Sequence, residues 1–316
     1  MLLARKVSLR VLYGVFSLLF ISFVTFVIQS FASGDVATIL AGEKASPMMV
    51  EHLRHQLGLD RPLLVQYFDF LWKALHGDLG HSYFSTQQSV VSIIAQNLPM
   101  TMEIASIAIV LSAIIGILFG TIAAVYEERS QDWAILSLST LGVTIPTFVL
   151  APILVYIYSL RLDELPQTWE IPLRDAEWKY LLLPVIILAA RPTASIIRLT
   201  RSSMVETLRQ EFIRMAVAKG VPRGSLIFKH ALRNAILPVV TSIGTNFGYL
   251  LSGSFIIERF FRLPGIGAKT IEAMQQRDTP VIQGCIIATG ALFVLVNLIV
   301  DLSVPLLDPR VRDTAL

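Results

Sequence analysis

Six apolar stretches, each long enough to cross a lipid bilayer as a helix, dominate this 316-residue chain. The hydrocarbon core of a bilayer is about 30 Å thick, and a helix needs about 20 apolar residues to cross it. The fourth stretch is the weakest, because Arg191-Pro192 interrupts it and an arginine near mid-membrane costs roughly 3 kcal/mol. The pattern predicts an all-α integral membrane protein with six transmembrane helices, over residues 11–31, 101–126, 134–160, 180–197, 236–257 and 281–304.

The composition supports lipid as the solvent for most of the chain. Apolar residues make up 54% and charged residues 16%, whereas soluble proteins contain about 25% charged residues. A soluble protein of this size has too little interior to bury so much apolar sequence. The net charge of +3 is too small to indicate a nucleic-acid-binding protein. A single cysteine, Cys285, excludes an intrachain disulfide and a CxxC motif.

The basic residues give the orientation. Arg5, Lys6 and Arg10 precede the first apolar stretch as in a signal peptide, but that stretch is longer than a signal core of about 7–15 residues. We therefore expect residues 1–31 to form a cytoplasmic N-terminus and a retained first helix. Six spans then place the tail, residues 305–316, in the cytoplasm as well. The segments on that side carry 14 of the 26 Lys and Arg residues, at about twice the density of the outer segments.

The longest polar segment, residues 32–100, is expected to form a small extracytoplasmic insert. Within it, Leu63–Leu75 has apolar residues at steps of three and four, which predicts an amphipathic helix, and Met48–Leu57 predicts a shorter one. His52 and His55 are three residues apart, a spacing that occurs in metal sites. Surface histidines are the simpler interpretation, and we expect no metal ion on this chain.

The cytoplasmic segment 198–235 combines eight Lys and Arg residues with apolar residues at helical spacing, and Gly220–Gly224 interrupts it. This pattern predicts two amphipathic helices joined by a turn. The apolar faces favour a docking surface for another protein. A basic amphipathic segment that lies on anionic lipid is the alternative.

Several runs of sequence point to a known family. Three of them are Phe212-Ile213-Arg214, Ala216–Gly220 and His230–Pro238. The others are residues 57–67, 77–80, 145–152, 263–267, 277–284 and 297–311, and all of these runs occur in the same order as in the family. Together they resemble the dipeptide/oligopeptide/nickel permease family of ATP-binding-cassette (ABC) importers, in its first-permease type. The general importer signature is degenerate here, because Arg214-Met215-Ala216 replaces its E-A-A triplet and only the last Ala is kept.

The resemblance implies a type I, MetI-like permease fold over residues 101–304 and a multi-pass subunit in the bacterial inner membrane. Such a subunit forms half of the pathway of an importer for di- or oligopeptides and has no catalytic residues. The implied partners are a second homologous permease subunit, two ABC ATPases that bind ATP and Mg²⁺, an extracytoplasmic substrate-binding protein and membrane lipid. No cofactor is implied on this chain. A nickel-chelate or sugar-like cargo, and a self-sufficient secondary transporter, are the alternatives.

Two sets of candidate residues follow. The set expected to contact an ATPase comprises Phe212, Arg214, Ala216, Gly220, Val221 and Arg223, in which Gly220 supplies either an unusual backbone angle or a close approach to the partner. The set expected to line the pathway comprises Arg191, Thr241, Thr245, Asn246, Gly248 and Ser252. Helix packing is the alternative for the second set, because Gly244-x3-Gly248 and Gly116-x3-Gly120 are packing patterns. Pro146, Pro152 and Pro184 predict kinks.

Overall fold

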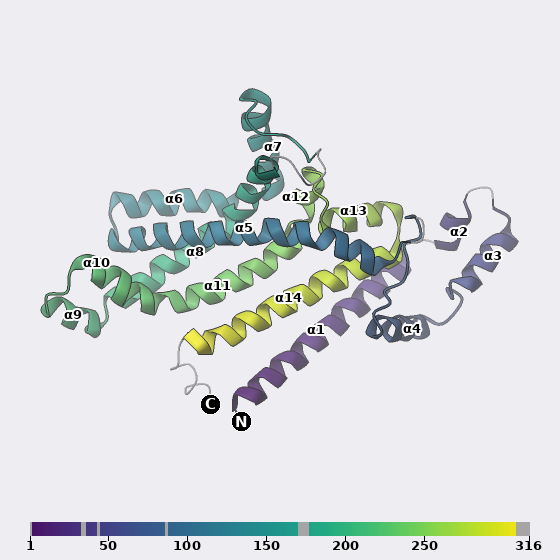
Figure 1. Ribbon diagram of the computed structural model, residues 1–316, viewed down its shortest axis with the longest axis horizontal. Coiled ribbons are helices and arrows are strands. Elements are labelled where there is room, and N and C mark those ends of the chain that lie inside the picture. The colour runs from purple at the N-terminus through teal and green to yellow at the C-terminus, as the bar shows by residue number, and fades with distance from the viewer. Residues whose placement is uncertain (1, 33–35, 43–44, 86–87, 170–176, 308–316) are drawn as a thin grey trace. The chain divides into compact units, whose positions relative to one another are not determined.

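The computed structural model describes residues 2–32, 36–42, 45–85, 88–169 and 177–307, so residues 308–316 of the predicted tail lie outside it. In these ranges the chain is built of helices, and an isolated β-bridge joins His81 to Ser89 (Figure 1). The elements are α1 (Leu2–Ala32), α2 (Val36–Ala41), α3 (Pro47–Gln56), α4 (Leu63–Leu75), α5 (Val90–Val125), α6 (Ser130–Thr144), α7 (Thr147–Val155), the π-helical η1 (Tyr156–Arg161), α8 (Glu177–Leu208), α9 (Glu211–Ala218), α10 (Arg223–Ser225), the π-helical η2 (Leu226–Ala231), α11 (Leu232–Gly253), α12 (Phe255–Phe260), α13 (Ile266–Gln276) and α14 (Thr279–Leu307).

Five helices of the described chain are long and apolar enough to cross a membrane, and a bent pair makes a sixth candidate span. The fourth predicted stretch is part of α8, which continues through Pro184 and Pro192 to Leu208. The predicted insert helix Leu63–Leu75 is α4, with the same bounds, and the shorter predicted helix is α3.

The third predicted span, 134–160, is not one straight helix. It is divided into α6 and α7–η1, and the two parts are bent by 101°. Pro146 causes the break, because its ring restricts the preceding residue to an extended conformation, and Ile145 has φ −82° and ψ 117°. The prediction of a kink at Pro146 was therefore confirmed, and the third predicted span is a bent pair of helices.

The helix that contains the second predicted span is longer than that span. Helix α5 begins at Val90, eleven residues before the predicted stretch at 101–126, and includes Pro99. Gln96 and Asn97 are polar, so the length of the apolar run did not predict this first part of the helix. The side-chain amide of Asn97 donates to the carbonyl of Ile93 at 2.7 Å, one turn earlier in the same helix.

The chain divides into two compact units, of which the first comprises residues 1–101 and 264–294. Its core is formed where the start of α5, α13 and the first half of α14 pack together, through Val90, Ile93, Ile266, Ala273, Val281, Ile282 and Cys285. Two hydrogen bonds fix this arrangement. The Ser82 hydroxyl donates to the Asp278 carboxylate at 2.5 Å, and the Ile266 amide donates to the Thr101 hydroxyl at 2.9 Å.

The second unit comprises residues 102–263 and 295–316 and is organised around α8, which packs against α6, α7, α11 and α12. The Gly116-x3-Gly120 pattern of α5 serves helix packing. A Cβ atom at Gly116 would lie 2.5 Å from Ile196 Cγ2 of α8, and one at Gly120 would lie 2.7 Å from the Ile197 carbonyl oxygen. The two helices therefore approach each other as closely as the pattern indicated.

Gly120→Ala is expected to destabilise the chain by about 1–3 kcal/mol, because the added methyl overlaps backbone and side-chain atoms of α8. The matched control is Gly290→Ala in α14, where the new Cβ meets its nearest neighbours at an ordinary 3.6 Å. Thermal unfolding of the detergent-solubilised variants measures the effect. Equal midpoints for the two variants would contradict the packing role of Gly120.

Candidate functional site

A cavity of about 880 Å³ lies in the second unit, where the α6–α7 break, α8 and α11 meet. Five of the six residues predicted to line a pathway border it, namely Arg191, Thr241, Thr245, Asn246 and Ser252. The sixth, Gly248, is buried and does not border the cavity. The fold thus brings a stripe of α11 and an arginine from α8, about 50 residues earlier in the sequence, to one space.

The lining residues occupy one face of each helix. On α8, Leu188, Arg191, Ser195 and Arg198 follow at steps of three, four and three, and residues at such steps lie on the same side of a helix. On α11, the Thr245 hydroxyl donates to the Thr241 carbonyl at 3.1 Å, and the Asn246 amide donates to the Ser242 carbonyl at 2.8 Å. These bonds stay within α11 and do not tie its polar side chains to another helix. The Gly244 face of α11 does serve helix packing, because a Cβ atom at Gly244 would overlap the side chain of Val300 on α14.

The cavity is positively charged. Arg191 and Arg198 both border it with exposed side chains, and its lining residues include no Asp or Glu. The two arginines are seven residues apart, about 10 Å along the helix axis. Arg198 was predicted only as part of the cytoplasmic segment 198–235, although its spacing of seven residues from Arg191 was a signal that the two share one helix face.

An ion pair that the sequence did not suggest joins α6 to α8. The guanidinium of Arg201 donates to the Asp132 carboxylate at 2.6 Å and 2.5 Å, and the backbone amide of Glu128 donates to the same carboxylate at 2.9 Å. The Asp132 side chain is only 3% exposed and that of Arg201 is 23% exposed. Arg201 is one turn beyond Arg198, so this pair fixes α8 against α6 close to the cavity.

The predicted ATPase-contact residues lie in α9, in the turn that follows it and at the start of α10. Helix α9 packs its inner side, Phe212 and Ile213, against a cluster that includes Met204, Ala124 and Ala231. Of the other predicted residues, Arg214, Gly220 and Arg223 are exposed, whereas Ala216 and Val221 are half-buried. We call residues 209–229 the basic segment from here on.

Gly220 provides the backbone angle that ends α9. Its φ is +76°, a left-handed conformation that residues with a Cβ resist, and a Cβ atom there would meet nothing within 4 Å in this chain. The Gly220 amide donates to the Val217 carbonyl at 2.9 Å and the Val221 amide to the Ala216 carbonyl at 3.1 Å. This is the Schellman arrangement, which closes a helix and reverses the chain.

The outer side of the basic segment combines exposed apolar and basic side chains. Met215, Val217 and Phe228 are each 57–61% exposed, and the basic residues Arg214, Lys219, Arg223 and Lys229 of the same segment are exposed as well. Because α9 already buries Ile213 and packs the half-buried Phe212 against this cluster, the exposed residues are not needed for the core of the unit. The geometry is that of a short rigid helix with a free apolar and basic surface.

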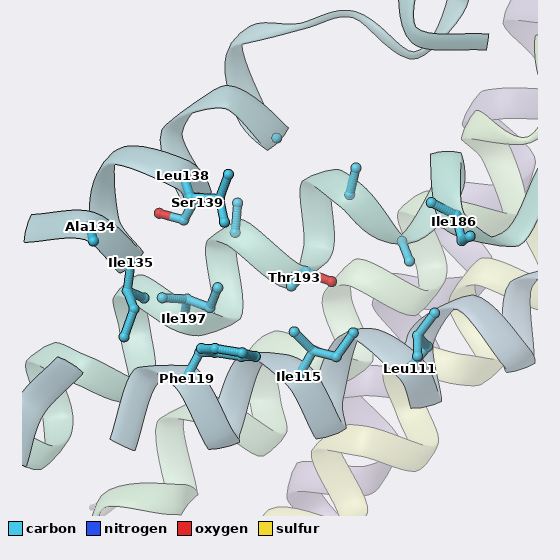
Figure 2. A pocket seen from close by; sticks show the side chains of 14 residues that line it. Leu111, Ile115, Phe119, Ala134, Ile135, Leu138, Ser139, Ile186, Thr193 and Ile197 are labelled. Atoms are coloured by element: carbon cyan, nitrogen blue, oxygen red, sulfur yellow. The ribbon is translucent and has the colours of Figure 1, made fainter. Parts of the chain in front are cut away.

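A second cavity, of about 420 Å³, differs in chemistry. It lies between α5, α6 and α8, and its lining is apolar except for Ser139 and Thr193 (Figure 2). Ser139 donates its hydroxyl to the Leu136 carbonyl of its own helix at 2.8 Å. Because this space offers almost no polar group to a solute, the cationic cavity is the candidate site for a polar substrate.

Comparison with known proteins identifies two matching families. Residues 116–313 match the family described as "Binding-protein-dependent transport system inner membrane component". Residues 3–105 match the family described as "Binding-prot-dependent transport system membrane comp, N-term".

Curated relatives match over nearly the full length. A putative peptide transport system permease protein of Brucella abortus is 39% identical over 306 residues, which cover 96% of this chain and 97% of the relative. The dipeptide transport system permease protein DppB of Bacillus subtilis is 37% identical, with 94% of each chain covered. The glutathione transport system permease protein GsiC of Escherichia coli is 36% identical, with 95% of this chain and 97% of the relative covered.

Proposed function

This chain belongs to the family of binding-protein-dependent transport system inner membrane components, and from that premise we propose that it forms half of the translocation pathway of an ATP-driven peptide importer. Family membership confirms the resemblance to ABC importer permeases and the all-α, multi-pass inner-membrane fold. The relatives named for peptide, dipeptide and glutathione transport support peptides as the cargo.

The cationic cavity is the observation that carries the choice of cargo. A peptide at neutral pH has a terminal carboxylate and many amide groups. In our proposal Arg191 and Arg198 attract the carboxylate, because a guanidinium forms charge-assisted hydrogen bonds with it. Thr241, Thr245 and Asn246 also border the cavity, and in our proposal their hydroxyl and amide groups suit the polar backbone of a peptide.

The basic segment is proposed to transmit the motion of the ATPases. Two ATPase subunits bind ATP and Mg²⁺ and hydrolyse ATP, and this chain is the non-catalytic subunit on which one of them acts. The exposed Met215, Val217 and Phe228 fit an apolar groove, and Arg214 and Arg223 fit acidic groups at its rim. A second homologous permease completes the pathway, a substrate-binding protein delivers the peptide from outside, and both termini are cytoplasmic.

The proposed function is tested by reconstitution. The chain is purified with its co-expressed partners and placed in proteoliposomes, and uptake of radiolabelled dipeptides and oligopeptides is measured with and without ATP and the binding protein. Peptide uptake that requires both supports the proposal. Uptake of a nickel chelate or a sugar oligomer instead would support the other cargoes, and ATP-independent uptake by this chain alone would support a secondary transporter.

Arg191→Gln is expected to lower uptake of a peptide with a free terminal carboxylate by roughly ten- to a hundredfold, because a hydrogen bond to a charged group contributes about 1.5–3 kcal/mol. Uptake of the same peptide with an amidated C-terminus should change little. Arg191→Lys keeps the charge and should recover part of the loss. An equal loss for both peptides would mean that Arg191 does not recognise the carboxylate.

A further inference from the structure

We propose that α4 lies along the membrane surface at the end of α1 nearest Phe31, with one face among the lipid acyl chains. This helix belongs to residues 32–100, which were predicted to form an extracytoplasmic insert. The inference concerns the first unit only and does not depend on the substrate or on the ATPases.

Four large apolar side chains form an exposed stripe on α4. Leu64, Phe68, Trp72 and Leu75 are 61%, 64%, 68% and 81% exposed, and they follow at steps of four, four and three along one helix face. Soluble surfaces rarely carry a contiguous apolar patch of this kind without a partner. We therefore expect lipid or another protein to cover these four side chains.

The contact with α1 sets the depth of α4. The Tyr67 hydroxyl lies 2.8 Å from the Ser22 hydroxyl and donates to the Leu19 carbonyl at 3.1 Å, and the rings of Phe23 and Phe26 pack on Tyr67. Ser22 precedes the end of the apolar span at Phe31 by nine residues, or about 13 Å along the axis. A tyrosine side chain is shorter than this distance, so the α4 backbone at Tyr67 lies deeper than the level of Phe31.

The polar side chains of α4 are on a different face. Asp69 forms an ion pair with Arg61 at 2.9 Å, and the Gln66 side-chain amide donates to the Arg61 carbonyl at 2.8 Å. With Lys73, these residues border a cavity of about 330 Å³ in the first unit. Each residue turns the helix by about 100°, so Asp69 and Lys73 are turned away from the neighbouring Phe68 and Trp72. An apolar face beside a charged face is typical of a helix in the membrane interface.

Lipid fits the stripe better than a soluble protein does. The stripe contains no charged side chain, and α4 is attached to a helix whose apolar window is only 6% buried and thus itself faces lipid. A binding protein that associates and leaves in every cycle would return these four side chains to water each time, which the hydrophobic effect opposes. Trp72 is also of the type that is enriched at membrane boundaries.

The test uses nitroxide labels on α4. Phe68→Cys, Trp72→Cys, Asp69→Cys and Lys73→Cys are each made in a Cys285→Ala background, which is simple because Cys285 is the chain's only cysteine. In phospholipid vesicles, collisions of each label with oxygen, which concentrates in acyl chains, are compared with collisions with a water-soluble nickel complex. Labels at 68 and 72 are expected to favour oxygen, and those at 69 and 73 to favour nickel, by several-fold.

The labels at 69 and 73 are matched controls on the same helix. Leu64→Cys and Leu75→Cys repeat the measurement on the stripe in case a ring is needed for folding. Equal access of nickel to all positions would overturn the proposal. Protection of positions 68 and 72 that appears only after the binding protein is added would also overturn it, in favour of a protein-docking surface.

Discussion

Gly220→Val is expected to leave the chain in the membrane but to reduce ATP-driven peptide uptake by about tenfold or more, while ATP hydrolysis continues. Gly220 has φ +76°, and a β-branched residue in that conformation costs roughly 1–2 kcal/mol or more. The strain is relieved if the last turn of α9 opens. Opening breaks the bonds from Gly220 and Val221 to the carbonyls of Val217 and Ala216.

The consequence for transport follows from the surface that α9 presents. Met215 and Val217 are exposed in its last turns, so a change in that turn displaces the residues proposed to contact the ATPase. A helix transmits displacement only while its hydrogen bonds hold, and an open turn absorbs the motion instead. Insertion is unaffected because α9 lies outside the candidate spans.

Two variants make the Gly220 test specific. Gly224→Val changes an exposed glycine in the same segment, but Gly224 has no left-handed φ and its Cβ would meet nothing within 4 Å, so uptake should stay close to normal. Gly220→Asn should retain much of the activity, because asparagine tolerates the left-handed conformation. The measurement is the ratio of peptide taken up to ATP hydrolysed in proteoliposomes. Normal coupling in Gly220→Val would refute the assigned role of the turn.

Asp132→Ala is expected to destabilise the chain by about 3 kcal/mol, at the lower end of the range for breaking a buried ion pair. The carboxylate is 3% exposed and accepts from Arg201 and from the Glu128 amide, so its loss leaves a charge and an amide without their partner. The lower end applies because the Arg201 side chain retains 23% exposure to solvent. The thermal midpoint in detergent should fall by roughly 6–12 °C.

The control for Asp132 is a nearby exposed pair. The Glu127 carboxylate oxygen lies 2.8 Å from a guanidinium nitrogen of Arg209, and the two side chains are 31% and 69% exposed. Glu127→Ala should therefore lower the free energy of unfolding by less than about 1 kcal/mol. Asp132→Leu combined with Arg201→Met should be less destabilising than Asp132→Ala, because no unpaired charge remains. A drop for Glu127→Ala as large as that for Asp132→Ala would contradict a special role for the buried pair.

Local features of the fold were predictable to the residue. The amphipathic pattern gave the bounds of α4, and Pro146 marked the end of α6, because both depend on neighbouring residues alone. Helix α5 begins eleven residues before the predicted span, because an apolar run ends at polar residues such as Asn97 whereas the helix continues through them. Val90 and Ile93 pack against α13 and α14, and this packing stabilises the part of α5 that precedes Gln96 and Asn97.

The candidate site could be predicted only in part. The spacing of Thr241, Thr245 and Ser252 indicated one helix face, and Arg191 stood out as a charge inside an apolar stretch. That these residues border one cavity, that Arg198 joins them, and that Asp132 pairs with Arg201 depends on contacts between helices distant in sequence.

The sequence by itself determined how many segments are apolar enough to enter a membrane, where the chain turns, and which helix faces are polar. Those properties follow from residue type and from the period of a helix. The tertiary structure decided which helix faces pack together. It also decided the angle of 101° between α6 and α7, since Pro146 determines only where the break lies. The relative position of two helices is set by close packing. Gly116 and Gly120, for example, allow α5 to approach α8 closely. Such packing depends on atoms from distant parts of the chain, which residue type and helix period alone do not specify.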